Sequence, residues 1–391
     1  MKRAKTYEEI KPLIKLCKEG KLFEIQAWIS EGKPVNPPLP PEKGNRRKIP
    51  LEIAISCGFH SLVQVLLEGG AAIEEPRYSA LEQALSNRRL DLVKLLVEHG
   101  ADIHSVDMTW VFDTWDPKIM EYFIENGADA ETGYPLAWAF ISRIRTSLGI
   151  FKRYKDRFPS FKEQVNIALR HHCKEGNLKW ASLMLWAGGD PYARGPEVPD
   201  GEPDPEEDWN ALELAAFHGH FEVFGLKQIL LDPSRPDTQH LLRSVCYSGN
   251  AKLLKELLDT GFNPVDQENG GSSLIQYLIQ GMGWSLDINP FKDDRKKNID
   301  TSRTREKIKM IHMLAKHGAK WVPNDRSEIA DARRSLLRLS PDYTMEFIWI
   351  MTKYNACKRE DIAQLINSPK MRILLSTHLP RLKELIEEHA G

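Results

Sequence analysis

The side chains most able to bind a metal or attack a substrate come together at one place in the sequence, His171-His172-Cys173. Neighbouring residues of a helix point about 100° apart, so these three side chains cannot share one ion unless other ligands come from elsewhere. The sequence holds five cysteines, an odd number, and no two of them have the spacing of a metal-binding pair. We therefore predict free thiols in a reducing compartment, no metal site and no cofactor.

Patterns of catalytic residues are missing from the sequence. It contains no glycine-rich phosphate loop, no nucleophile elbow and no His-Glu-x-x-His zinc motif. Residues 325–391 could hide an enzyme or a nucleic-acid binder, but they offer only scattered Arg, Asp and His. The sequence therefore predicts that the chain is not an enzyme.

Charge and hydropathy argue against two further classes of function. Lys and Arg number 54 and Asp and Glu number 55, so the net charge of −1 favours no charged partner. No apolar run approaches the roughly 18–20 residues of a membrane span. The N-terminus is basic and then acidic, without the apolar stretch of a secretory signal. We expect a cytoplasmic protein with no membrane contact.

One pattern recurs along the chain, in which a turn joins two short amphipathic segments and a glycine closes them. Its clearest copy runs from Leu81 to Ile103, with Ser86-Asn87-Arg88-Arg89 between the segments and Gly100-Ala101-Asp102 after them. Leu51 opens the preceding copy, 30 residues before Leu81. Isolated helices of about 8–10 residues are marginal in water. The copies must therefore stack on one another and bury a shared core.

The best copy of the first segment and its turn is N-A-L-E-L-A-A-F-H-G-H-F-E-V at residues 210–223, and E-H-G-A-D and E-N-G-A-D close second segments at residues 98–102 and 125–129. These motifs closely resemble the ankyrin repeat, whose period is about 33 residues. The resemblance implies an all-α ankyrin-repeat solenoid of about nine or ten helix-turn-helix repeats, several of them degenerate, with helical caps. The irregular array is similar to prokaryotic or viral ones. The resemblance also implies helix and turn contacts, rather than catalysis, for His218, His220, Glu52, Glu82 and Glu213.

The quality of the copies divides the chain. We expect an N-terminal capping repeat at 1–36, a repeat array at 37–324, and degenerate C-terminal helices with a cap at 325–391. Insertions interrupt the array at 37–48, 195–209 and 284–304. Segments inserted into a rigid array lie on its edge or its binding face, so these departures are where recognition should be sought.

Local charge marks several of the irregular segments, which are basic at 37–48, 143–157 and 284–309 and acidic at 197–208. The acidic segment could attract a basic partner, or it could be a solvated loop. The basic insertion 284–309 could contact phosphates, but its own carboxylates and its few aromatic residues argue against that role. We expect a protein partner rather than nucleic acid.

Candidate partner-binding residues fall into three groups. Tryptophan and arginine dominate interface hot spots, and tryptophans lie in or beside irregular first helices or their preceding turns at Trp110, Trp115, Trp138 and Trp209. The basic segment adds Arg143 and Arg145. The resemblance implies that the tips between repeats add Arg77, Tyr78, His104, Asp107, Arg194, Gln267 and Asn269. Core packing is the alternative role for each tryptophan, and we expect it for Trp180 and Trp186.

These features predict a non-enzymatic scaffold that binds a folded protein partner through its concave face and loops and modulates that partner. Similar bacterial proteins neutralise toxins or serve in defence systems, which implies an inhibitor, an immunity protein or a defence-system component. The alternative is a host-directed effector or adaptor that recruits a host complex. That role would need a recognition box outside the repeats, and residues 379–385 could begin either such a box or a cap helix.

Overall fold

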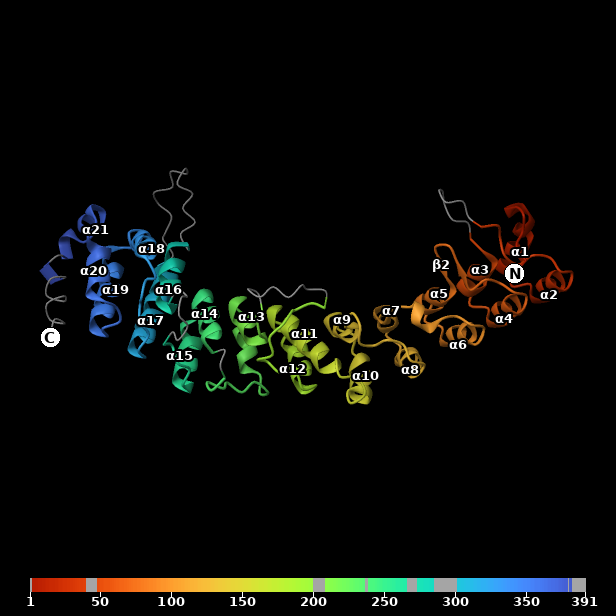
Figure 1. Cartoon of the computed structure of the whole chain (residues 1–391), viewed down its shortest axis with the longest axis horizontal. Coiled ribbons are helices and arrows are strands. Elements are labelled where there is room, and N and C mark those ends of the chain that lie inside the picture. The colour runs from red at the N-terminus through yellow and green to blue at the C-terminus, as the bar shows by residue number, and fades with distance from the viewer. Residues whose placement is uncertain are drawn as a thin grey trace. The chain divides into compact units, whose positions relative to one another are not determined.

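The computed structural model describes residues 2–39, 48–199, 208–235, 238–265, 273–284, 301–378 and 380–381 (Figure 1). Several predictions lie outside the described residues, namely those for Gln267, Asn269 and the segments 40–47, 200–207, 285–300 and 382–391. The chain divides into two compact units, each taken by itself below. The first comprises Met1–Ala168, Ala187–Gly189 and Glu197–Glu202, and the second comprises Leu169–Trp186, Asp190–Pro196 and Pro203–Gly391.

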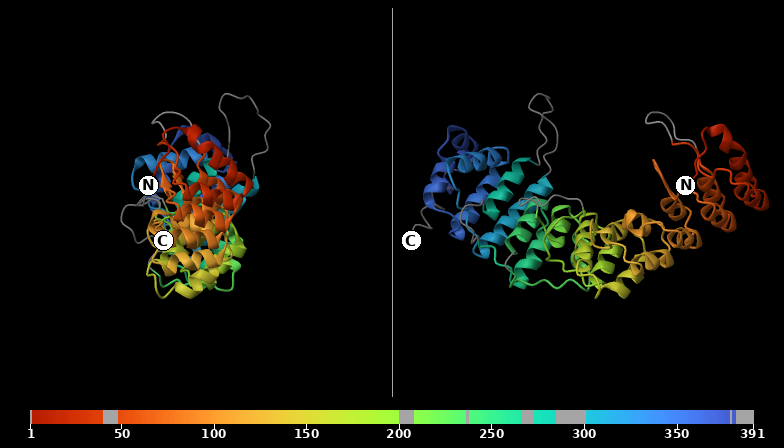
Figure 2. Two further views of the ribbon diagram at one scale, coloured as in Figure 1. Left: turned by 90° about the vertical axis from the view of Figure 1, so that its right-hand side faces the viewer. Right: turned by 45° about the vertical axis from the view of Figure 1, so that its right-hand side comes forward.

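The first unit is built from pairs of antiparallel helices joined by tight turns. The pairs are α1 (Tyr7–Glu19) with α2 (Leu22–Ser30), α3 (Pro50–Cys57) with α4 (His60–Glu68), α5 (Ala80–Ser86) with α6 (Leu90–Glu98), α7 (Met108–Asp113) with α8 (Pro117–Glu125), and α9 (Pro135–Ile141) with α10 (Ser147–Tyr154). A short hairpin of β1 (Glu74–Glu75) and β2 (Tyr78–Ser79) precedes α5, with Glu75 paired to Tyr78. First helices pack on first helices and second helices on second helices, so the pairs form two rows (Figure 2).

The second unit continues the same scheme, and α11 (Phe161–Lys174) spans the boundary between the units. Its further helices are α12 (Leu178–Trp186), α13 (Ala211–Phe217), α14 (Thr238–Ser248), α15 (Ala251–Thr260), α16 (Leu274–Trp284), α17 (Thr301–Lys316), α18 (Arg326–Leu336), α19 (Pro341–Lys353), α20 (Arg359–Ile366) and α21 (Pro369–Leu374). The first helices α13, α14, α16, α18 and α20 pack in that order. Stacked helix pairs of this kind are a solenoid, which confirms the predicted fold class.

Local sequence explains where the helices begin. Ser79 caps α5 by accepting a hydrogen bond from the Glu82 backbone N–H at 3.3 Å. Asn210 and Glu213 form a reciprocal capping box at α13, because the Glu213 N–H donates to Asn210 Oδ1 at 2.9 Å and the Asn210 N–H donates to Glu213 Oε2 at 3.0 Å. Glu213 thus makes the helix contact that the sequence implied, and Glu52 Oε2 likewise accepts from the Ile49 N–H at 3.3 Å.

The repeated leucines form the core of each unit. Leu51 and Leu81 are buried in the first unit, and Leu212 and Leu242, also 30 residues apart, are completely buried in the second. Trp321 closes the core of the second unit, where its Nε1–H donates to Gln276 Oε1 at 2.7 Å. Each short helix therefore gains its stability by burying one face against its neighbours.

Two elements differ from the expected pattern. After α13 the second helix is replaced by a 3-10 turn at Phe221–Gly225 and irregular chain. Trp180 is buried as predicted, but Trp186 is 61% exposed, so the prediction that it fills the core is wrong. The physical reason is helical geometry, because residues six apart on a helix point about 120° away from each other.

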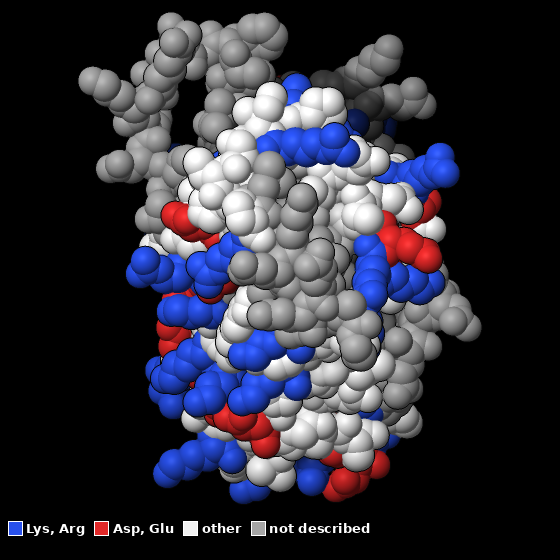
Figure 3. Space-filling model, turned by 90° about the vertical axis from the view of Figure 1, so that its left-hand side faces the viewer, with Lys and Arg blue, Asp and Glu red and all other residues white. Residues whose placement is uncertain are grey.

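The last helices of the second unit carry exposed cations, which are Lys358, Arg359, Lys370 and Arg372. Figure 3 shows Lys and Arg over much of the surface at this end. Among the described residues, no helix is both long and apolar enough to cross a membrane.

Candidate functional site

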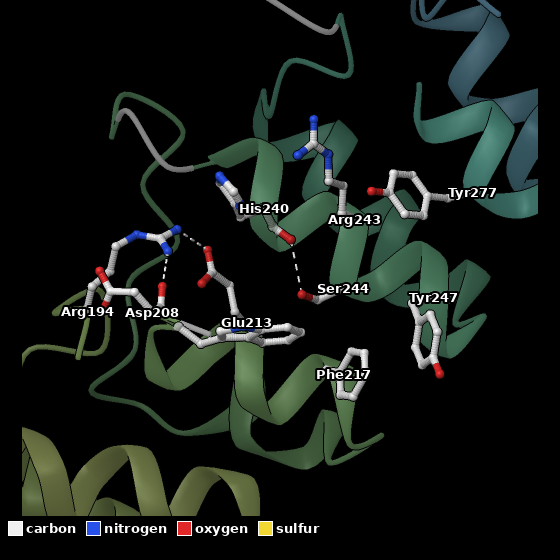
Figure 4. A pocket seen from close by; sticks show the side chains of 10 residues that line it. Arg194, Asp208, Glu213, Phe217, His240, Arg243, Ser244, Tyr247 and Tyr277 are labelled. Carbon is white, nitrogen blue, oxygen red and sulfur yellow. Dashed lines mark hydrogen bonds and ion pairs between the residues drawn. The ribbon is translucent and has the colours of Figure 1, made fainter. Parts of the chain in front are cut away.

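A pocket of about 440 Å³ opens on the first helices of the second unit (Figure 4). Its lining comes from α13, α14 and α16 and from the two loop segments that precede α13. It consists of Arg194, Asp208, Trp209, Glu213, Phe217, His240, Arg243, Ser244, Tyr247 and Tyr277. Two of the residues predicted from the sequence, Arg194 and Trp209, therefore lie in one pocket although 15 positions separate them.

Aromatic rings form one wall of the pocket. The ring of Trp209 meets Phe217 edge-on, with centroids 4.7 Å apart and an interplanar angle of 81°. Phe217 in turn stacks on Tyr247, with centroids 4.4 Å apart. Phe217 and Tyr247 are 30 residues apart and occupy equivalent places in consecutive first helices. Tyr247 keeps 63% of its surface exposed, so the wall ends in a ring that faces solvent.

Charged side chains form the rest of the lining. Arg194 Nη2 lies 2.7 Å from Glu213 Oε1, and Glu213 is 1% exposed. Arg194 Nη1 also donates to the backbone carbonyl of Asp208. Arg243 lies over the ring of Tyr277 at 5.9 Å, and Figure 4 shows Arg243 and His240 on the side away from Phe217. The pocket thus pairs an aromatic wall with a cationic one.

A buried arginine, Arg170 on α11, holds the loop that carries Arg194. Arg170 is 1% exposed, and its guanidinium donates to the carbonyls of Pro196 at 2.7 Å, Ala193 at 3.1 Å and Arg194 at 3.2 Å. Gly195 lies in that loop at φ 143°, and a Cβ there would come 2.9 Å from Arg170 Nη2. A bridge between Gly195 and Trp209 then places Trp209 beside Arg194. Arg170 therefore positions both pocket residues.

The role of Arg170 is hard to predict from sequence, since a lone arginine in a helix usually lies on a solvated face. The one available signal was its place between Leu169 and His171 in the buried part of α11, where a charge needs partners. In chemical terms, the pocket suits an apolar or aromatic side chain against Trp209 and Tyr247. Arg243 adds positive charge to the same lining.

The first unit brings two predicted tryptophans into register. Trp110 on α7 and Trp138 on α9 are 28 residues apart, and α7 packs against α9. Trp110 is 56% exposed, whereas Trp138 is half-buried. Trp115 is 46% exposed and lies in the turn between α7 and α8, so it belongs to the edge of the unit and not to the surface of the first helices.

The remaining predicted residues of the first unit lie in turns. Arg77 is at the tip of the β1–β2 hairpin at φ 66°, and the Tyr78 hydroxyl donates to Gln83 Oε1 at 2.7 Å. His104 is exposed, and Asp107 caps α7 by accepting from the Thr109 N–H at 2.7 Å. These positions leave their side chains accessible, and they give Asp107 a role in the fold as well. The basic pair Arg143 and Arg145 is exposed in the turn between α9 and α10.

Residues 11–107 match the family model for ankyrin repeats, in three copies. The family model thus identifies ankyrin repeats in this part of the first unit. Two curated relatives are ankyrin repeat and KH domain-containing proteins of nematodes, one from Caenorhabditis briggsae (24% identical over 228 residues) and one, mask-1, from Caenorhabditis elegans (23% over 234 residues). These matches cover 54% and 56% of the chain but only 8% of either relative.

Among solved structures, the ankyrin repeat domain of Bcl-3, a member of the IkappaB family, is 17% identical to the chain with a TM-score of 0.30. The match covers 61% of this chain and 86% of the other. Ankyrin repeats are protein–protein interaction modules and typically have no enzymatic activity. The coarse prediction of a protein-interaction scaffold is therefore confirmed.

Proposed function

We propose that this protein binds a folded protein partner through its first helices, and that the pocket of the second unit receives an aromatic or large apolar side chain of that partner. The observation that carries the proposal is the ring series Trp209, Phe217 and Tyr247, which ends in a tyrosine that is 63% exposed. Rings held by one another lose little entropy when a partner binds, and tyrosine and tryptophan are enriched in binding hot spots.

The rigidity of the pocket supports the same role. Arg170 fixes the loop of Arg194 through three carbonyls, and Glu213 fixes the Arg194 guanidinium. A preformed pocket avoids the cost of ordering side chains upon association. In the first unit, the aligned Trp110 and Trp138 extend the partner-binding residues along a second set of first helices.

The finer role that we propose is modulation of the partner by covering part of its surface, as an inhibitor, an immunity protein or a defence-system component would do. A cytoplasmic location fits this role, because Cys17, Cys173 and Cys246 are free thiols and free thiols are typical of a reducing compartment. Residues 379–385, which could begin the recognition box of a host-directed adaptor or a cap helix, are described only at 380–381.

A capture experiment with the tagged full chain tests the proposal. A folded protein should be retained by the wild type and lost with Tyr247→Ala, since loss of a hot-spot ring weakens binding by about 2 kcal/mol, or roughly 30-fold. Trp186→Ala is the matched control, because Trp186 is a ring of the same unit that is 61% exposed and does not line the pocket. Retention of the partner by Tyr247→Ala, or capture of no protein by the wild type, would contradict the proposal.

A further inference from the structure

In most of the described repeats, the turn between the first and second helix has a left-handed residue at an equivalent position. Glycine occupies that position in most repeats, at Gly20, Gly58, Gly176, Gly219 and Gly249. Three consecutive repeats of the first unit have large side chains there instead, which are Arg88 (φ 53°), Trp115 (φ 60°) and Arg143 (φ 64°). We call these three residues the turn row.

Hydrogen bonding shows that the positions are equivalent. The backbone N–H of Gly58 donates to the carbonyl three residues earlier at 3.0 Å. The N–H groups of Arg88, Trp115 and Arg143 make the same bond, at 2.7, 3.0 and 2.9 Å. The members are 27 and 28 residues apart, so each belongs to the next repeat along the chain. The turn row therefore runs along one edge of the first unit.

The fold does not require these side chains. Glycine adopts the left-handed region without steric cost, whereas arginine and tryptophan adopt it only at a cost in free energy. All three side chains are exposed, and within the described part of the chain none of them has a hydrogen bond, an ion pair or a ring contact. No contact of these side chains within the described residues therefore offsets the free-energy cost of the left-handed backbone. Strained residues of this kind cluster at binding sites.

The turn row is cationic at its two ends, where Arg88 and Arg143 lie, and Asp113 and Asp116 flank Trp115 between them. Arg145 lies two residues after Arg143, and it too is exposed and has no ion pair within the described residues. Of the neighbouring carboxylates, Asp91 is held by Arg89 at 2.6 Å, and Asp116 accepts the Lys118 N–H at 2.9 Å. Asp113, at the end of α7, is the exposed carboxylate beside Trp115.

We propose that the turn row binds an acidic, extended segment of a protein partner, with an apolar side chain on Trp115 and carboxylates on the arginines at either side. Packed helices lie about 8–10 Å apart, and α7 packs on α9 and α8 on α10, so the turns of Trp115 and Arg143 lie about that far apart. A row of three turns at that spacing spans roughly 20 Å. That length corresponds to about six residues of extended chain. Arginine binds carboxylates through paired hydrogen bonds.

A protein segment fits this edge better than a nucleic acid does. A phosphate backbone carries regularly spaced negative charge and would place some of it beside Asp113. A peptide can put its neutral residue there, over Trp115. The inference goes beyond the proposed function, because the turn row lies in the first unit and the aromatic pocket lies in the second.

The test uses the full chain and a fluorescein-labelled peptide of Asp and Glu with one central Phe, with binding measured by fluorescence anisotropy. Arg88→Gly, Trp115→Gly and Arg143→Gly should each raise the Kd about tenfold. Glycine keeps the left-handed turn, so the two arginine variants should unfold at the same temperature as the wild type or higher. Arg143→Glu reverses the charge without removing the side chain and should abolish binding.

Two controls separate the turn row from other causes. Lys152→Ala removes an exposed cation of the same unit, and Tyr247→Ala alters the pocket of the second unit; both should leave the Kd of the peptide within about twofold. The proposal would be overturned if the glycine variants bound the acidic peptide as tightly as the wild type does. It would also be overturned if the wild type bound a lysine version of the peptide equally tightly. So would a single-stranded oligonucleotide of equal charge that binds as tightly and is lost in the same variants, or glycine variants that unfold at lower temperature.

Discussion

Phe217 and Tyr247 stack face to face, with ring centroids 4.4 Å apart and 11° between the ring planes. The two residues end consecutive first helices, α13 and α14, so the stack joins two repeats at the mouth of the pocket. A contact between equivalent positions of neighbouring repeats contributes to the interface between the repeats, and that interface is what stabilises a helical array.

We expect this stack to appear as a coupling free energy of about 0.5–1 kcal/mol. The change is a double-mutant cycle with Phe217→Leu and Tyr247→Leu, which keeps apolar volume and removes the rings. The free energy of unfolding, measured in urea, should fall less in the double variant than the sum of the two single variants. A coupling free energy of zero would mean that the contact between the two rings does not stabilise the fold.

The buried guanidinium of Arg170 leads to a second prediction. Arg170→Met should lower the free energy of unfolding by about 3 kcal/mol, because three loop carbonyls lose a charged donor. Limited proteolysis should then cut within residues 191–199, which should resist cleavage in the wild type. The control is Lys174→Met on the same helix, at a half-buried position, which should leave the loop resistant. An unchanged cleavage pattern in Arg170→Met would show that the loop holds its own shape.

Much of the fold could be predicted from the sequence because it is coded locally. Leu212 recurs at the repeat spacing as Leu242, and the capping box of Asn210 and Glu213 is readable within four residues. Such signals depend on residues that are close in the chain. They give the helix pairs and their stacking without any knowledge of distant contacts.

The pocket could be predicted only in part, since its parts are distant in the chain. Trp209 and Arg194 were recognisable as residue types that favour interfaces. Their meeting depends on Arg170, whose acceptors lie in a loop 23 to 26 residues further on. Similarly, the six-residue spacing of Trp180 and Trp186 means that they point about 120° apart on α12, but which of the two faces the core depends on the neighbouring helices. Spacing alone did not reveal either fact.

The left-handed turns give a stability prediction with a definite sign. Arg88→Gly and Arg143→Gly each remove a steric cost of about 1–2 kcal/mol. The greater freedom of glycine in the unfolded chain offsets about 0.5–1 kcal/mol of that gain. We therefore expect each variant to be more stable by roughly 0.5–1 kcal/mol in urea unfolding. Arg88→Ala is the control, because alanine retains a Cβ and should gain nothing; an equal gain in both variants would assign the effect to the lost charge.

The buried thiols predict how stability depends on alkaline pH. Burial raises the pKa of the Cys173 and Cys246 thiols from 9.0 to about 12. Between these values the unfolded chain has lost the thiol protons while the folded chain keeps them, so the free energy of unfolding falls as pH rises from about 9 to 12. The slope is about 1.4 kcal/mol per pH unit for each thiol, and the contribution is fully present below pH 9.

Cysteine-to-alanine variants isolate this effect from lysine and tyrosine, which titrate in the same range. Cys173→Ala and Cys246→Ala should each reduce the slope of the free energy of unfolding between pH 9 and 11 by about 1.4 kcal/mol per pH unit. The smaller alanine side chain also lowers the free energy of unfolding by a constant amount that does not depend on pH. Cys57→Ala is the matched control because Cys57 is exposed, and it should leave the slope unchanged. A slope that is the same in all four proteins would mean that the thiols at 173 and 246 are accessible to water in the folded chain.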